Sequence, residues 1–307
     1  MNVQDDYNIL MLKSSIDTIK HPLFIMTVDV DGWSSILNFY SIVHDPFVTS
    51  LQVRVEEGIK KLLQLFKKHN INATFFITGN IAQNNDWIIK KIINNGHEIA
   101  CHGLTHRKNE FLLPEMNQRN SIEKATQIIK EINGAAPKGF RAPCLRANET
   151  TIKILEEYGY MYDSSVLPSL IPGYYGSPGA PLKPYYPSPF SLNKRGSHKL
   201  LEIPVSINPL IPIPLSAAWM RNLGSSWVKF GVIMNFILGN PVVLYVHPRD
   251  VISLPVIKGM PWHVYRNVGT QTIRMLDNVI EYGKTLGAKF IKAVDLALVK
   301  NKYTNRD

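Results

Sequence analysis

Short, continuously apolar runs recur along this chain and predict β-strands. The first, at residues 22–30, reads PLFIMTVDV, and such a run is typical of a strand that is covered on both faces. Similar runs occupy residues 73–77, 96–101, 139–143, 200–205, 242–247 and 288–291. Together with the Tyr162-Asp163 pair, they give seven or eight candidate strands.

The residues between these runs carry apolar side chains at helical spacing. Val55, Ile59 and Phe66 mark one such segment, and Asn148 can cap another at residues 149–158. Further helices are predicted at residues 88–93, 115–133, 225–238 and 273–283. Strand and helix alternate at least four times, which predicts a parallel sheet in an α/β protein. Seven or eight strands suit a barrel better than an open sheet.

Two segments without periodicity are expected to be loops. Residues 32–50, which contain Trp33, form a loop long enough to be a functional rim. Residues 170–189 are rich in Pro, Gly, Ser and Tyr, which indicates an ordered surface loop or lid. The second loop is not expected to link two domains, because a strand-like run resumes at residue 200, before the strand count is complete.

The size of the chain fits this organisation. Its 307 residues, 45% of them hydrophobic, can bury one large core or two small ones. No internal repeat or low-complexity tract divides it. We therefore expect a catalytic domain at residues 22–299, an N-terminal extension at 1–21 and a C-terminal tail at 300–307.

The formal net charge of +10 favours acidic polymers or an anionic membrane surface as partners, although solubility is the simpler explanation. Lysines such as Lys60, Lys61, Lys67 and Lys68 are spread along predicted helices. No arginine and aromatic track accompanies them, so nucleic acid is not expected as a partner.

The first residues, 1–6, are acidic and lack the basic start and apolar core of a secretory signal. We expect a cytoplasmic protein that could act at the inner face of the membrane. The apolar stretch 210–238 would suit such a peripheral membrane contact, but a buried barrel helix explains it more simply. Only Cys101 and Cys144 are present, so no disulfide framework is expected. The oligomeric state is left open.

Two histidines, His102 and His106, follow the third predicted strand. If the turn that carries them is helical, both imidazoles lie on one face and could grip one metal ion. This spacing alone is weak, because two surface histidines would give the same pattern. A third ligand type comes from Asp29 and Asp31 at the end of the first strand, where carboxylates are costly to bury unless paired or metal-bound.

Titratable side chains follow most of the predicted strands. Since the carboxyl ends of parallel barrel strands meet at one face, where barrel enzymes assemble their sites, we expect these side chains to converge. They are Asp29, Asp31, His102, His106, Arg141, Asp163 and His247.

These segments together resemble the polysaccharide deacetylase family, the carbohydrate esterases built on the NodB homology domain. The resemblance covers residues 22–295 and agrees in order and spacing. It rests on TVDVD at 27–31, ATFF at 73–76, HGLTH at 102–106, GFRAP at 139–143, YDSS at 162–165 and VLYVHP at 243–248. The chain looks most like the branch with exopolysaccharide and peptidoglycan deacetylases. The resemblance implies a distorted barrel of about seven β/α units.

The resemblance also implies a metal site. Asp31, His102 and His106 would be the ligands of one divalent ion, usually zinc in this family. Two imidazoles and one carboxylate leave positions open for water and substrate, as a catalytic metal requires.

The catalytic roles carried over with the resemblance concern the remaining strand ends. Asp29 would be the general base, and Arg141 would keep it ionised and aimed. His247 would be the general acid for the leaving amine, held and charged by Asp163. The backbone N–H of Cys144 would meet the oxyanion.

The sequence departs from the family pattern in three places. Val30 separates the two aspartates, which are commonly adjacent, and Cys144 stands where an aromatic residue is common. The tryptophan that often follows the fourth-motif aspartate is missing. Trp33, Trp219 or Trp262 could supply a sugar-stacking surface instead, although packing explains each of them more simply.

The expected function is therefore a metal-dependent hydrolase that removes an N-acetyl group from an amino sugar in a glycan or a lipid-linked sugar. A deformylase or a cyclic-amide hydrolase remains an alternative on the same scaffold. A non-catalytic glycan-binding protein is a third possibility, but none of the base, acid or ligand positions is lost here.

Overall fold

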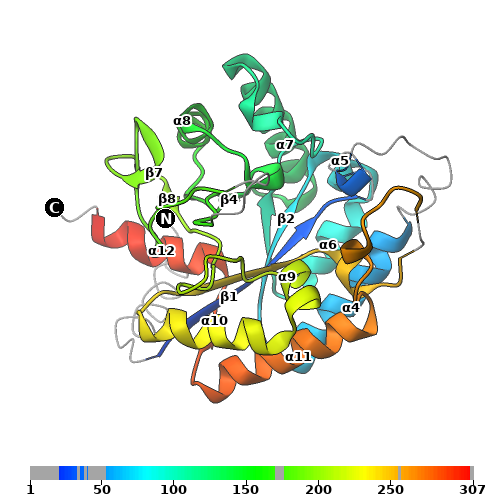
Figure 1. The fold of residues 1–307 in the computed structure, drawn as a ribbon. Helices are drawn as coiled ribbons and strands as arrows, with labels where there is room; N and C mark the ends of the chain where they lie inside the picture. Colours follow the sequence, from blue (N-terminus) through cyan, green and yellow to red (C-terminus); the bar gives the residue numbers. More distant parts are fainter. Residues whose placement is uncertain are drawn as a thin grey trace.

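A computed structural model of the chain describes residues 21–32, 35–37, 40, 53–169, 176–254 and 257–304. A curled parallel sheet runs through its centre, with helices packed around the outside (Figure 1). The strands of this sheet are β1 (Leu23–Val30), β2 (Thr74–Ile77), β3 (Glu98–Cys101), β4 (Gly139–Phe140), β5 (Tyr162–Asp163), β8 (Leu201–Glu202), β9 (Val242–Val246) and β10 (Lys289–Phe290).

The helices of the described residues confirm each of the predicted helical segments, and α7 has the predicted bounds. They are α4 (Val53–Lys68), α5 (Gly79–Asn84), α6 (Asp86–Asn94), α7 (Glu115–Asn133), α8 (Glu149–Glu157), α9 (Ala217–Leu223), α10 (Ser225–Ile237), α11 (Thr270–Thr285) and α12 (Ala293–Thr304). Asn148 caps α8 as expected, since its side chain accepts a hydrogen bond from the Thr151 N–H at 3.0 Å. The short helices α5 and α9 and the last helix, α12, were not predicted.

The strand order explains why this sheet is a distorted barrel. Along the sheet the order is β10-β1-β2-β3-β4-β5-β8, and β9 pairs with the other side of β1. β10 pairs only with the start of β1, so the seven other strands of the described sheet form the barrel. The barrel closes between β8 and β9 through residues that follow β8 and are not part of a strand. There the Ser206 N–H donates to the Val243 carbonyl at 3.0 Å. The predicted distorted (β/α)7 barrel is confirmed.

Alternation along β1 decides what enters the barrel. Side chains of a strand point to opposite faces in turn, so Phe24 and Met26 join the apolar layer beneath the helices, whereas Ile25 packs with the barrel interior. By the same alternation, Asp29 and Asp31 share the interior face with Ile25. The strand therefore delivers two carboxylates to the inside of the barrel, at its carboxyl end.

The predicted lid at residues 170–189 is only partly described. Residues 170–175 lie outside the described part of the chain, and a small antiparallel hairpin of β6 (Pro187–Ser188) and β7 (Ser191–Arg195) begins near its end. The segment is therefore less irregular than predicted.

The predicted domain limits are not tested at the N-terminus, because the extension at 1–21 falls almost wholly outside the described residues. At the other end, α12 continues past residue 299 to Thr304. Among the described helices, none is both long enough and apolar enough to cross a membrane.

The first prediction concerns Gly58, where α4 packs on the backbone that follows β9. A Cβ at this position would lie 2.2 Å from the Pro248 carbonyl oxygen. Alanine favours a helix over glycine by about 1 kcal/mol, but relieving this clash should cost about 1–3 kcal/mol. We expect Gly58→Ala to lower the free energy of unfolding in urea titrations. The neighbouring exposed change Glu57→Ala should alter it by less than about 0.5 kcal/mol; an equal effect of both would contradict the packing argument.

The second prediction concerns His97, whose ring packs against Phe66 and Phe75 and whose Nδ1 accepts the Ala73 N–H at 3.0 Å. Burial lowers the pKa of His97 from 6.5 to about 4. His97 therefore binds a proton more readily in the unfolded chain than in the folded one. The free energy of unfolding should then decrease as the pH falls from 6.5 towards 4.

Chemical unfolding at several pH values measures this loss for His97. We expect the change His97→Asn, which keeps an acceptor near the Ala73 N–H, to flatten the pH dependence in this window. An unchanged slope in the variant would show that other groups cause the loss.

Candidate active site

A cavity of about 470 Å³ opens at the carboxyl ends of the barrel strands. Its volume lies in the range of pockets that hold small-molecule ligands. The polar floor comes from the ends of β1, β3 and β9, and α9 and the segment around Trp262 supply much of the apolar wall. The strand-end residues Asp29, Asp31, His102, His106 and His247 all line this cavity, as the barrel prediction required.

The structure places Arg141 beside Asp29, as predicted. Its Nη1 donates to Asp29 Oδ1 at 2.7 Å and to Thr27 Oγ1 at 2.9 Å, while Nε and Nη2 donate to Ser164. The guanidinium also lies over the Phe76 ring, 4.2 Å from its centroid. With the side chain fully buried, these contacts leave the guanidinium one orientation.

The charge state of Asp29 follows from these neighbours. Burial alone would raise its pKa, but the Arg141 guanidinium outweighs burial and holds the pKa below the ordinary value of 3.8. Asp29 is therefore a carboxylate at neutral pH. A buried carboxylate with a fixed orientation can accept a proton from a water molecule in the cavity.

The turn that carries the two histidines is not helical. The sequence analysis had placed both imidazoles on one face only if this turn were a helix. Gly103 has φ +71° and His106 has φ +60°, so the chain turns through the left-handed region. The two imidazoles still meet, with ring centroids 5.0 Å apart. A glycine at position 103 is needed for this turn, because its φ is unfavourable for other residues.

Glu110 holds this turn and was missed by the sequence analysis. Its buried carboxylate accepts the N–H groups of Leu104 at 2.8 Å, Thr105 at 3.2 Å and Arg107 at 3.2 Å. The hydroxyls of Thr105 and Ser121 donate to it as well. No local pattern marked Glu110, because its role depends on backbone groups that only the left-handed turn exposes.

The predicted metal ligands have donor atoms of the right kind. His102 Nδ1 donates to the Arg141 carbonyl at 2.6 Å, which leaves the lone pair on Nε2. His106 Nε2 lies 3.3 Å from Asp31 Oδ2, and this buried oxygen has no hydrogen-bond partner among the described residues. Burial lowers the pKa of His102, and it lowers the pKa of His106 to about 4. Both rings are therefore neutral at pH 7 and able to bind a cation.

Arg249 was not predicted, and it contacts the same carboxylate. Its Nη1 donates to Asp31 Oδ1. Burial would raise the pKa of Asp31, but Arg249, His247 and His106 lower it to about 2.

In the described part of the chain, no three His, Cys, Asp or Glu side chains are gathered closely enough to hold a metal ion as they stand. Asp31 and the two histidines fit such an ion by donor type and by the orphaned oxygen.

His247 is held by Asp250 and not by Asp163. The Asp250 Oδ2 atom lies 3.4 Å from His247 Nδ1 and accepts the His247 backbone N–H at 2.8 Å. Arg221 completes the contact, with Nη2 3.1 Å from Asp250 Oδ1. The segment HPRD at 247–250 contained the signal, since an aspartate three residues after a strand end can cap the turn that follows.

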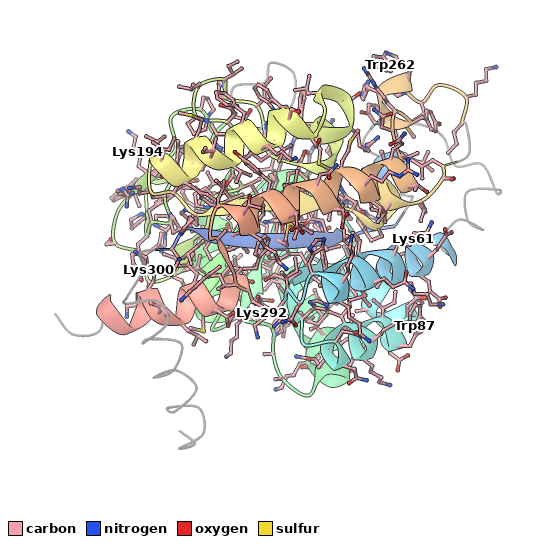
Figure 2. All side chains as sticks on the ribbon, turned by 90° about the horizontal axis from the view of Figure 1, so that it is seen from below. Lys61, Trp87, Lys194, Trp262, Lys292 and Lys300 are labelled. Carbon is pink, nitrogen blue, oxygen red and sulfur yellow. The ribbon has the colours of Figure 1, made fainter. Side chains whose placement is uncertain are left out.

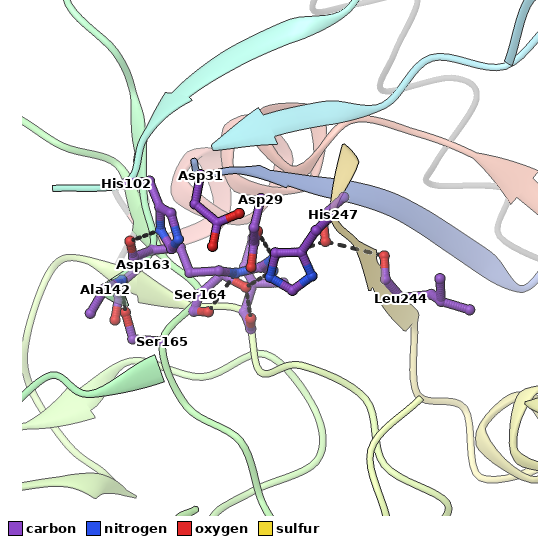
Figure 3. A network of polar contacts seen from close by, with 12 residues as sticks. Asp29, Asp31, His102, Ala142, Asp163, Ser164, Ser165, Leu244 and His247 are labelled. Atoms are coloured by element: carbon purple, nitrogen blue, oxygen red, sulfur yellow. Dashed lines mark hydrogen bonds and ion pairs between the residues drawn. The ribbon is translucent and has the colours of Figure 1, made fainter. Parts of the chain in front are cut away.

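Asp163 has a different position from the predicted one. Its Oδ1 accepts a hydrogen bond from Ser165 Oγ at 2.6 Å, and Ser165 Oγ accepts the Ala142 N–H at 2.8 Å (Figure 3). Burial raises the pKa of Asp163, and burial and Asp163 together raise the pKa of Glu202 well above its ordinary value. The predicted support of His247 by Asp163 is therefore wrong: Asp163 supports the chain around residue 142.

Cys144 lines the cavity in a left-handed conformation, with φ +56°. It follows Pro143 at the start of a 3₁₀ turn, where the first N–H groups have no partner within the turn. Burial raises the pKa of its thiol to about 11, so the thiol is neutral at pH 7. The oxyanion role of the Cys144 N–H stays a prediction.

The predicted tryptophans divide into three cases. Trp219, on α9, lines the cavity. Trp262 lines it as well and is 68% exposed at its edge. Trp33 lies outside the described residues, so its predicted contact with substrate stays a prediction.

Part of this chain is similar to known proteins. Residues 49–162 match the family model for polysaccharide deacetylases. A peptidoglycan deacetylase from Helicobacter pylori is 31% identical over 157 residues, which make up 51% of this chain and 53% of that protein. The match thus spans about half the length of this relative.

Solved structures extend the likeness over the whole barrel. A structure from Mycobacterium smegmatis, assigned as a polysaccharide deacetylase, covers 94% of this chain and 93% of its own, with a TM-score of 0.64 and 21% identity. Puue allantoinase covers the same shares with a TM-score of 0.66 and 19% identity. At these identities the structures show the fold alone. The family model and the sequence relative carry the likeness further: residues 49–162 of this chain match a polysaccharide deacetylase domain.

Proposed function

We propose that the protein is a metal-dependent hydrolase that removes the N-acetyl group from an amino sugar of a glycan. The observation that carries the proposal is the convergence, on one cavity, of a fixed carboxylate from β1, two neutral imidazoles after β3 and an imidazole after β9. Hydrolysis of an amide needs a base for the attacking water and an acid for the leaving amine. Asp29 and His247 are suited to these two roles.

Asp29 acts as the base. It accepts a proton from the water that attacks the acetamide carbonyl, and Arg141 keeps the carboxylate ionised and aimed between proton transfers. The pair is buried, so the guanidinium cannot turn away to solvent without leaving a buried charge uncompensated.

His247 acts as the acid. It donates a proton to the amine as the carbon–nitrogen bond breaks, and Asp250 Oδ2, 3.4 Å from its Nδ1, holds the ring in place. Arg221 holds Asp250 in place, and burial of Asp250 is outweighed by Arg221 and His247, which lower the pKa of this carboxyl. The acid therefore has a partner that stays ionised over the working pH range.

Asp31, His102 and His106 would hold one divalent metal ion, for which we propose zinc. The family is generally dependent on a divalent metal, and such an ion lowers the pKa of water and polarises a carbonyl when bound. For this chain, the orphaned Asp31 Oδ2 and the hydrogen bond that fixes the His102 tautomer support the assignment. Arg249 neutralises Asp31 from the other side.

The oxyanion of the tetrahedral intermediate would accept the Cys144 N–H, which needs no movement of a side chain. Trp219 and Trp262 offer apolar faces to the sugar ring. The name of the H. pylori relative favours peptidoglycan, or another glycan with N-acetylated amino sugars, as the substrate. The cyclic-amide alternative has only the fold of the allantoinase behind it and is not favoured.

The third prediction tests the base. Asp29→Asn removes the proton acceptor while keeping the shape of the side chain, and we expect kcat to fall by about 10²–10⁴. Acetate release from N-acetylglucosamine oligomers measures the loss. The surface variant Asp86→Asn, on α6, is the matched control and should keep the parental rate. Turnover that survives in Asp29→Asn would rule out this aspartate as the base.

The fourth prediction tests the metal ligands. His106→Ala should reduce the metal content of protein purified without added ions, because the ligand set loses one of its three donors. Elemental analysis gives this readout independently of activity. His198→Ala serves as the control, since His198 pairs with Glu156 and does not line the cavity. Equal metal content in both variants would refute the proposed ligand set.

A further inference from the structure

The outer face of α10 is apolar although it is exposed. This helix, with the sequence SSWVKFGVIMNFI, has Lys229 as its single charged residue. A helix that is apolar on all sides is normally buried in a core or a membrane. Here α10 lies beside α11 on the outside of the barrel (Figure 2). The simpler explanation of the segment, a buried barrel helix, therefore covers only its inner side, at Val228, Gly231 and Val232.

Exposed apolar side chains lie on α10 and on the loop at 207–214, which contacts this helix. Ile237 is 69% exposed and Leu210 is 63% exposed. The loop at 207–214 is fixed to α10, because Asn235 Nδ2 donates to the Ile207 carbonyl at 2.9 Å. We call this surface the α10 face; it consists of Leu210, Ile211, Phe230, Ile237 and Leu238.

The charge of this part of the chain is one-sided. Of the 24 acidic residues, Glu202 is the single one between positions 164 and 249, and it is fully buried. The same 86 positions contain seven lysines and arginines. Lys229 lies on α10 itself, and Lys183 Nζ is 3.6 Å from where a Cβ of Gly239 would be, next to Leu238. The α10 face is thus apolar, and the stretch of chain that carries it has exposed cations but no exposed carboxylate.

This combination selects one kind of partner. An apolar helix face flanked by lysines is typical of helices that lie in the interface of an anionic bilayer, and each basic group near such a surface adds about 1 kcal/mol of attraction. At 13 residues, α10 is shorter than the roughly 20 residues that span a bilayer, so it would lie on the surface.

We propose that the α10 face docks the protein on the surface of an anionic lipid bilayer. The proposal does not depend on the reaction catalysed. Trp219 and Leu223 of α9 line the catalytic cavity, and α10 begins directly after Gly224. The helix then runs to Ile237 and Leu238, shortly before β9 begins at Val242, so its exposed C-terminal end lies away from the cavity.

The fifth prediction is tested by sedimentation of the full chain with vesicles. We expect binding to vesicles of phosphatidylglycerol and phosphatidylcholine, weaker binding to phosphatidylcholine alone, and release at high salt. The double variant Phe230→Glu/Ile237→Glu should bind the anionic vesicles at least about tenfold more weakly, since it removes two apolar anchors and adds repulsion. Met116→Glu, at a 67% exposed methionine of α7, is the control and should bind like the parent.

Several outcomes would overturn the proposal. Equal vesicle binding by the parent and the double variant would show that the α10 face is not the contact. A concentration-dependent dimer that the double variant abolishes, without vesicle binding by the parent, would assign the face to a second copy of the chain. Neither variant touches the catalytic residues, so acetate release from soluble oligomers should persist in both. Loss of vesicle binding with intact turnover therefore separates this proposal from the proposed reaction.

Discussion

The buried ion pair between Arg141 and Asp29 is the contact on which the rest of the site depends. Arg141 joins four parts of the barrel: its guanidinium binds Asp29 and Thr27 of β1 and Ser164 after β5, and its carbonyl fixes the ring of His102. A charge buried without its partner costs about 3–5 kcal/mol. The pair therefore forces the ends of these strands into one arrangement, and that arrangement places both the proposed base and a proposed metal ligand.

The same kind of buried ion pair occurs at two other places around the cavity. Three aspartates at or after strand ends each meet an arginine from another segment, so these carboxylates, which would be costly to bury, stay ionised. Because an arginine holds a carboxylate by direct hydrogen bonds, each pair also limits the directions in which the carboxylate can act. The three pairs are Asp29 with Arg141, Asp31 with Arg249, and Asp250 with Arg221. The cavity floor is an array of opposite charges, and the neutral imidazoles lie between them.

Much of the fold could be predicted because its elements carry strong local patterns. β1 is an unbroken apolar run, and α7 has a regular periodicity that ends at Gly134, which takes the left-handed conformation of a helix C-cap. The hairpin of β6 and β7 and the short helices escaped prediction because two- to seven-residue elements leave no period to read. α10 was predicted as a helix, but its exposed side could not be known before its neighbours were placed.

The sequence by itself determined which chemical groups reach the carboxyl end of the barrel. Alternation along a strand and the order of the strands are local properties, so Asp29, Asp31 and the two histidines could be placed there without a structure. Tertiary structure alone decided their partners. Arg249 beside Asp31 depends on which side chains lie across the barrel. Distances between segments far apart in the chain are set by how the whole barrel packs, and no local pattern encodes them.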